Sequence, residues 1–174
     1  MCIKIVFSRE PYPICPMDHL FAPWRYAYIS NADAGTDCLL CGLARSSDDQ
    51  KALIVHRGQH CYVVLNAYPY TSGHVMIVPY EHLDQLQQLP APAAEEMMAL
   101  MQKLEGILRL LYRPDGLNVG MNLGKAAGAG IAGHIHMHVV PRWIADANFI
   151  SVIGEARVIP EALETTYNKI KSAF

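Results

Sequence analysis

Three histidines at every second position constrain this chain more than any other feature. Residues 134–142 read His-Ile-His-Met-His-Val-Val-Pro-Arg. Side chains alternate between the two faces of a β-strand, so this spacing predicts a strand with His134, His136 and His138 on one face. A helix would turn His136 away from the other two, and it would accommodate Pro141 badly. The apolar residues that alternate with them are expected in a core: Ile135, Met137 and Val139.

Three imidazoles on one strand face favour one of two kinds of chemistry. An imidazole can attack phosphorus at neutral pH and leave again, and His136 is the natural nucleophile because the other two histidines flank it. The competing interpretation is a metal site, since His-x-His on a strand is also a common way to bind zinc or iron. A purely structural role is usual for one strand histidine, but not for three in strict alternation.

Composition limits the class of protein. The chain has 174 residues, of which 52% are hydrophobic, and a formal net charge of −2. These values predict one domain with a sizeable core and without the broad basic surface of a nucleic-acid-binding protein. The apolar run in residues 1–10 is shorter than a signal peptide requires, and no stretch approaches the ~20 apolar residues of a membrane helix. Five cysteines without secretory features favour a reducing compartment. We therefore expect a cytoplasmic protein with no nucleic-acid or membrane partner.

Several other segments have a recognisable periodicity. Residues 61–66 and 74–79 are apolar on both faces and are joined by a turn containing Pro and Gly, which predicts a hairpin of inner strands. An apolar stripe at spacings of three and four predicts a long helix from about residue 90 to residue 112. Residues 117–122 alternate apolar and polar side chains, as a strand with one polar face does. A glycine-rich loop, residues 124–130, follows, and Pro160-Glu161 opens a short terminal helix. Together they predict an α+β antiparallel sheet.

The pair Cys38-Leu-Leu-Cys41 is weak evidence by itself. Two nearby cysteines are often buried apolar residues, and a redox pair is a second alternative. A structural zinc site needs two further ligands, commonly histidines. No partner is evident for the remaining cysteines: Cys2, Cys15 and Cys61.

The histidine motif, His134-x-His136-x-His138-Val139-Val140, resembles the signature of the histidine-triad (HIT) nucleotide hydrolases and transferases. The segment Asn66–Pro79 resembles the central hairpin of that family, and Asn122-Leu-Gly124 resembles the segment before the triad. The similarity covers residues 21–145. It implies a HIT-like fold, with a five-stranded antiparallel sheet, one long helix and a shorter one. Residues 1–20 are then an N-terminal arm, and residues 146–174 a C-terminal extension.

A narrower similarity lies outside the general motif. The segments that carry it resemble the subgroup of diadenosine tetraphosphate phosphorylases, or ATP adenylyltransferases: Ala22-Pro-Trp-Arg25, Gly120–Gly124, Pro141-Arg-Trp143, Asp146-Ala-Asn-Phe149 and Val158-Ile-Pro-Glu161. This resemblance implies an enzyme that cleaves a dinucleoside polyphosphate through an adenylyl-histidine at His136. With inorganic phosphate as acceptor the products are ADP and ATP, and with water they are AMP and ATP. One alternative is a hydrolase that uses water on dinucleoside polyphosphates or on adenylylated small molecules. A nucleotide-binding protein without turnover is the alternative from another class.

The same resemblance implies roles for other residues. His138 contacts the transferred phosphate, Asn66 the ribose hydroxyls, and Asn122 a phosphate oxygen. Gly130 stands where the family often has a glutamine that reaches the leaving group, so backbone N–H groups of this loop are the substitute. Arg142 and Trp143 are either surface and packing residues or part of the site rim.

By resemblance, a zinc site and a homo-oligomer are also implied. HIT-like proteins and their uridylyltransferase relatives bind zinc through a CxxC pair, a later histidine and the first triad histidine. The matching residues are Cys38, Cys41, His82 and His134. Proteins of this family pair through the long helix and a sheet edge, which implies a homodimer or a larger assembly.

The remaining histidines and a loop lysine are expected to have ordinary roles. We expect His56 and His60 near a loop and solvated, and His74 at the start of a strand without a catalytic role. Lys125 is expected to be solvated, as a lone loop lysine usually is.

Overall fold

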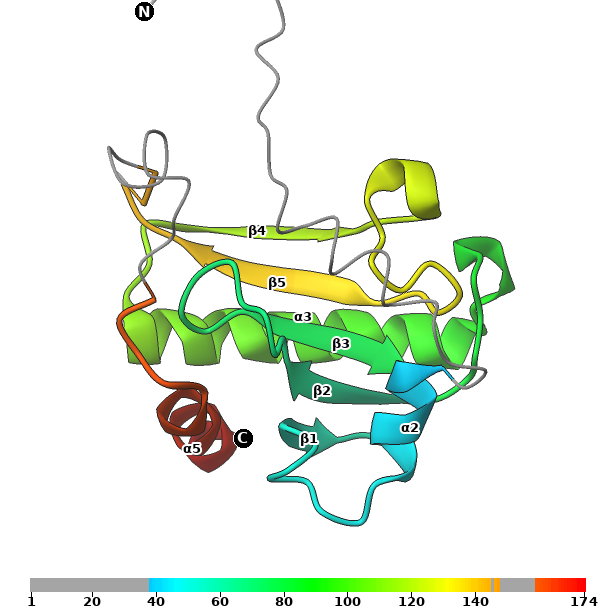
Figure 1. Ribbon diagram of the computed structural model, residues 1–174, viewed down its shortest axis with the longest axis horizontal. Coiled ribbons are helices and arrows are strands. Elements are labelled where there is room, and N and C mark those ends of the chain that lie inside the picture. The colour runs from blue at the N-terminus through cyan, green and yellow to red at the C-terminus, as the bar shows by residue number, and fades with distance from the viewer. Residues whose placement is uncertain (1–37, 145, 148–158) are drawn as a thin grey trace, which may run out of the picture.

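The computed structural model describes residues 38–144, 146–147 and 159–174. Five strands form one antiparallel sheet in the order β1-β2-β3-β5-β4 (Figure 1). The predicted α+β class and the five-stranded antiparallel sheet are therefore confirmed. The elements in chain order are α2 (Leu39–Arg45), β1 (Ile54–Arg57), β2 (Cys61–Leu65), β3 (Val75–Pro79), η1 (Leu86–Gln88), α3 (Ala91–Tyr112), β4 (Gly116–Met121), η2 (Lys125–Ala127), β5 (Met137–Arg142) and α5 (Leu163–Ala173).

Several predictions fall on segments outside the described residues. They are the N-terminal arm, Cys2, Cys15, the segment Ala22–Arg25 and most of the C-terminal extension before Ile159. Among the described residues, no helix combines the length and the apolar character that crossing a membrane requires.

The central hairpin is covered on both faces, as its uniformly apolar sequence predicts. All five residues of β2 and all five of β3 are buried. Val63, Val75 and Ile77 pack against α3 and α5 in one hydrophobic cluster. Tyr62 and Val64 pack on the opposite face, where Leu40 of α2 covers them. The sheet thus has a helical layer of α3 and α5 on one side and α2 on the other.

Helix α3 agrees with the predicted segment. Pro92 lies in its first turn, where a missing N–H costs nothing. One stripe is buried against the sheet, including Met97, Leu104 and Leu108. The helix ends where Arg113 adopts the left-handed conformation, with φ of 46°, just before Pro114. The methionine of this stripe therefore fills the core, as expected.

Two short elements, α2 and β1, were not predicted from the sequence. Neither is long enough to display a clear hydrophobic period, since α2 has seven residues and β1 has four. The prediction that His56 is solvated near a loop is wrong, because His56 belongs to β1. Its ring stacks on Phe174 with a centroid distance of 4.5 Å. His60 lies in the turn after β1 and is half-buried rather than solvated.

The histidine strand is shorter than its sequence pattern. β5 begins at Met137, so His134 and His136 lie in the segment just before it and not in the strand. β5 pairs with β3 through Met76 and His138, and with β4 through Gly120 and His138. The terminal helix α5 begins at Leu163, slightly later than Pro160-Glu161 suggested.

Candidate active site and metal centre

The three motif histidines lie together where β5 begins, between β3 and β4. His134 and His136 are buried, and His138 is half-buried. The rings of His136 and His138 have centroids 4.8 Å apart and meet edge to face. The alternation in the sequence therefore does bring the histidines together, with Val139 on the opposite, helical face.

His136 has the geometry of a nucleophile. Its Nδ1 lies 2.8 Å from the carbonyl oxygen of His134, so Nδ1–H donates to that oxygen. The neutral ring then carries a lone pair on Nε2, which has no hydrogen-bond partner among the described residues. Burial lowers the pKa of His136, partly opposed by the hydrogen bond to His134. A neutral imidazole with a defined tautomer is the form that attacks phosphorus.

His138 is oriented by a second histidine, His74. The backbone N–H of Tyr70 donates to His74 Nδ1 at 3.1 Å, which leaves the proton of the neutral ring on Nε2. His74 Nε2 lies 3.0 Å from His138 Nδ1 and donates to it. The proton of His138 is therefore on Nε2. Burial lowers the pKa of His74 to about 3 and that of His138 to about 4, with smaller contributions from neighbouring histidines, so both rings are neutral near pH 7.

The contribution of His74 was missed in the sequence, where it was expected only to start a strand. It immediately precedes β3 and is 1% exposed. A histidine fully buried in an otherwise apolar hairpin needs a polar partner, and this requirement was the available signal. The partner itself lies 64 residues away along the chain, so periodicity could not identify it.

Asn66 lies beside these histidines at the end of β2. It is 8% exposed, and its Oδ1 accepts the backbone N–H of Tyr68 at 2.9 Å. Its amide nitrogen lies 3.5 Å from His74 Nε2. The structure therefore places Asn66 beside His74, the histidine that contacts His138.

Asn122 and Gly130 are less closely attached to the histidines. Asn122 directly follows β4 and is half-buried. Gly130 lies in the loop before residues 134–138, which we call the histidine segment. Neither forms a hydrogen bond to a motif histidine within the described part of the chain. The loop turns tightly at Gly124 and Gly128, whose positive φ angles of 81° and 86° favour glycine.

Arg142 is already engaged by neighbouring residues. Its Nε and Nη2 donate to the two carboxylate oxygens of Asp146 at 2.5 and 2.8 Å, and Nη1 donates to Asn118 Oδ1 at 2.5 Å. The backbone N–H of Trp143 contacts the same carboxylate at 3.3 Å. These contacts fix the turn after β5. The guanidinium stays partly exposed at the end of the sheet face that carries His138.

A second cluster lies at the other end of the histidine segment. Cys38, Cys41, His82 and His134 each offer one ligand atom, and the four atoms lie within 4.8 Å of one another. Nδ1 of His134 is 3.4 Å from the sulfur of Cys38 and 3.5 Å from that of Cys41. Nδ1 of His82 is 3.4 Å from the sulfur of Cys41. The four residues suggested by sequence similarity are thus brought together from three separate segments.

The orientation of His134 suits a metal ligand. Its Nε2 lies 2.9 Å from the carbonyl oxygen of Pro79 and donates to it. This hydrogen bond leaves the lone pair on Nδ1, directed at the two thiols. Two sulfur and two imidazole ligands are a common set for tetrahedral zinc. The donor set and its convergence therefore fit a zinc ion.

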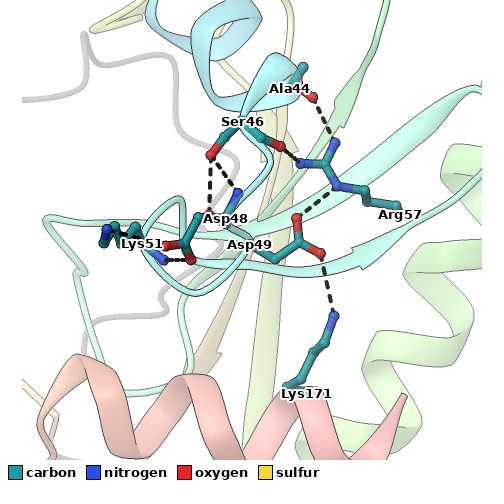
Figure 2. A network of polar contacts seen from close by, with 7 residues as sticks. All are labelled: Ala44, Ser46, Asp48, Asp49, Lys51, Arg57 and Lys171. Carbon is teal, nitrogen blue, oxygen red and sulfur yellow. Dashed lines mark hydrogen bonds and ion pairs between the residues drawn. The ribbon is translucent and has the colours of Figure 1, made fainter.

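A polar network fixes the helix that carries Cys41. Arg57 of β1 donates to the carbonyl oxygens of Ala44 and Ser46 at the end of α2, at 2.7 and 2.8 Å (Figure 2). Its Nε donates to Asp49 at 2.8 Å, and the other oxygen of Asp49 lies 3.7 Å from the Lys171 ammonium of α5. This network attaches α2 to β1, independently of any metal.

The sequence and the structure are similar to known proteins. Residues 47–143 match the family model of the HIT domain. The chain is 40% identical over 168 residues to a Mycobacterium tuberculosis protein named AP-4-A phosphorylase, a comparison that covers 92% of this chain and 86% of that protein. A zinc-bound histidine triad family protein from Mycobacterium smegmatis has a TM-score of 0.63 and 26% identity, covering 79% of this chain and 92% of that chain. A hypothetical histidine triad nucleotide-binding protein from Sulfolobus tokodaii has the same fold, with a TM-score of 0.62, 21% identity and coverage of 78% and 91%.

Proposed function

Since the chain belongs to the histidine-triad (HIT) family, we propose that it is an enzyme that converts diadenosine tetraphosphate and inorganic phosphate to ADP and ATP. The observation that carries this proposal is the hydrogen bond from His136 Nδ1 to the His134 carbonyl, which leaves Nε2 available to attack phosphorus. The mycobacterial relative named AP-4-A phosphorylase supports the choice of substrate.

In the first half-reaction, His136 Nε2 attacks the α-phosphorus of the dinucleotide. A nitrogen–phosphorus bond forms, the bond from that phosphorus to the bridging oxygen breaks, and ATP leaves with the electron pair. His138 carries its proton on Nε2 and can donate a hydrogen bond to a phosphate oxygen as charge develops. Because His74 donates to Nδ1 of His138, the proton of His138 is fixed on Nε2 before the substrate binds.

In the second half-reaction, an oxygen of inorganic phosphate attacks the phosphorus of the adenylyl-histidine. The nitrogen–phosphorus bond breaks, the electron pair returns to His136 Nε2, and ADP is the product. Water in place of phosphate gives AMP. The nucleophile and both steps are the same for the two acceptors, so the acceptor distinguishes a phosphorylase from a hydrolase.

The other proposed contacts follow from family resemblance and from position. Asn66, buried beside His74, binds the ribose hydroxyls, and Asn122 binds a phosphate oxygen. Gly130 contributes a backbone N–H near the leaving group. Arg142 and Trp143 form the rim of the site, where the guanidinium is bound to Asp146 and stays partly exposed.

We propose a structural zinc ion bound by Cys38, Cys41, His82 and His134. The convergence of the four ligand atoms within 4.8 Å supports it. The ion would link α2 to the segment that presents His136 through its coordination bonds. It would not act as a Lewis acid in the reaction. The zinc-bound state of the M. smegmatis relative supports the choice of zinc as the metal.

We also propose a cytoplasmic homodimer or larger homo-oligomer that binds no nucleic acid. Strand β4 lies at the edge of the sheet, and Val119 on it is 45% exposed. An exposed edge strand with an apolar side chain is suited to pairing with a second copy.

The test is incubation of the purified protein with diadenosine tetraphosphate, with and without inorganic phosphate, and separation of the nucleotides by ion exchange. Phosphate-dependent formation of ADP and ATP is expected. Formation of AMP and ATP regardless of phosphate would identify a hydrolase with the same nucleophile. Tight nucleotide binding without any product would contradict an enzymatic role and favour a binding protein.

A further inference from the structure

The side of His138 that faces β4 differs from its other sides. Gly120 of β4 is the register partner of His138 of β5. Directly paired residues of antiparallel strands project from the same face, so a side chain at position 120 would stand beside the His138 ring. The hydrogen bond from Arg142 to Asn118 shows that the even-numbered residues of both strands share this face.

The space beside Gly120 is open. A Cβ placed there would meet no atom of the described residues within 4 Å, and Gly120 is exposed. Its φ is not positive, so the backbone conformation does not require glycine. Glycine weakens a strand interior, and it often marks a place where a ligand approaches the backbone closely. The absence of a side chain at this position therefore has no explanation in the backbone or the packing.

The other sides of His138 are occupied. His74 lies 3.0 Å from its Nδ1, and the His74 ring is followed by Asn66. Met76 of β3 is its register partner on the side opposite Gly120. The His136 ring lies against it at 4.8 Å. On the β4 side, by contrast, the register position beside His138 carries no side chain.

We infer that Gly120 is a specificity-determining residue that leaves room for the departing polyphosphate nucleotide beside His138. This inference rests on the proposed function. With the ribose of the transferred adenylyl group at Asn66, on the β2 side, the leaving chain crosses Gly120 on the β4 side. Gly120 thus selects for leaving-group size and not for the adenylyl group.

The test compares two reactions that share the adenylyl-histidine. Phosphorolysis of diadenosine tetraphosphate has ATP as its leaving group. Exchange of labelled inorganic phosphate into ADP has only phosphate as its leaving group, because His136 attacks ADP at the same α-phosphorus. The variants are Gly120→Val, the milder Gly120→Ala, and Gly116→Val as control. Gly116 lies on the same face of β4, opposite Arg142, and a Cβ there also meets no atom of the described residues within 4 Å.

For Gly120→Val we expect kcat/KM for diadenosine tetraphosphate to fall about 10- to 100-fold, because displacement of a substrate by an ångström has effects of this size. The ADP–phosphate exchange should change less than about threefold, and Gly120→Ala should lie between Gly120→Val and the unchanged protein. Gly116→Val should leave both reactions unaltered. An equal loss of both reactions in Gly120→Val, or no loss in either, would overturn the inference. If the unchanged protein catalyses neither reaction, it is the proposed function that fails.

Discussion

The two ends of the histidine segment carry the same side chain on the same face, yet their surroundings prepare them for different chemistry. At one end, the Nε2 of His134 donates to Pro79, and Nδ1 faces two thiols. At the other end, the Nδ1 of His138 accepts a hydrogen bond from His74 Nε2–H, and the proton of the His138 ring is on Nε2. His134 thereby presents a lone pair to a cation, and His138 presents a donor to an anion.

The difference shows that the hydrogen-bond partner, and not the residue type, determines what each histidine can do. A neutral imidazole has one donor and one acceptor, so fixing one nitrogen fixes the other. His136 links the two ends, because the carbonyl oxygen of His134 fixes its Nδ1–H. The predictions for four variants follow this comparison, from the centre of the segment to its supports.

Replacement of His136 by Asn should have the largest effect. We expect adenylyl transfer to fall by at least about 10⁴-fold, as for other nucleophiles that act in a catalytic unit, while nucleotide affinity is retained. Single-turnover assays and equilibrium dialysis measure the two quantities. His60→Asn, in the turn between β1 and β2, is the matched control and should keep normal activity. Residual turnover above about 1% would remove His136 from the role of nucleophile.

Replacement of Cys38 by Ser tests the end of the histidine segment at which His134 faces the thiols. We expect bound zinc to fall from about one ion per chain to near zero, because a structural site uses all four ligands. The loss should lower the melting temperature and reduce activity about 10- to 100-fold by loosening the segment that presents His136. Metal analysis and thermal denaturation measure these effects. Cys61→Ala is the control, since Cys61 lies on the helical face, buried near the Ala93 carbonyl. Unchanged zinc content in the Cys38 variant would refute the assigned ligand set.

Replacement of His74 by Asn acts at the other end. We expect a loss in kcat of roughly 10- to 100-fold with unchanged zinc content, because His138 loses the donor that fixes its tautomer. Stopped-flow rates and metal analysis measure the two effects. A role that is only structural would instead lower stability without a selective fall in kcat.

The same variant should change how stability depends on pH. The pKa of His74 is about 3 in the folded protein, below the ordinary value of 6.5, because of burial and of the neighbouring His138 and His136. Between these two pH values, His74 is therefore protonated in the unfolded chain and neutral in the folded chain. Stability is lost as the pH falls from about 6.5 toward 3, and His74→Asn should flatten this slope. Urea titrations at several pH values measure it; an identical slope in both proteins would contradict the buried neutral state of His74.

Replacement of Arg57 by Ala should have the smallest effect, and only at the cysteine end. The change removes the donors to Ala44, Ser46 and Asp49, so we expect a fall of about 1–3 kcal/mol in the free energy of unfolding and faster loss of metal to a chelator. Lys51→Ala, in the loop between α2 and β1 and paired with exposed Asp48, should change the free energy of unfolding by less than about 0.5 kcal/mol. A large fall in kcat without any change in metal release would contradict this assignment.

Much of the fold was predictable because its periodic segments are long. The 22 residues of α3 display a buried stripe over several turns, and β2 and β3 are continuous apolar runs around a turn. The elements that were missed, α2 and β1, are short and contain polar residues that serve a network instead of a core, such as Arg57. The stacking of His56 on Phe174 joins residues 118 positions apart in the sequence, so no local pattern could predict it.

The sequence by itself determined the alternating histidines and the family of the chain. It also determined the residue types of the histidine site and of the Cys/His metal cluster, because alternation and motif spacing are local properties of the chain. Only the tertiary structure decided which nitrogen of each histidine is available. That choice depends on partners that are remote in sequence or on local backbone geometry: Pro79 for His134, the His134 carbonyl for His136, and His74 for His138. The same is true of Gly120, whose open space beside His138 exists because the register of β4 and β5 places the two residues opposite each other.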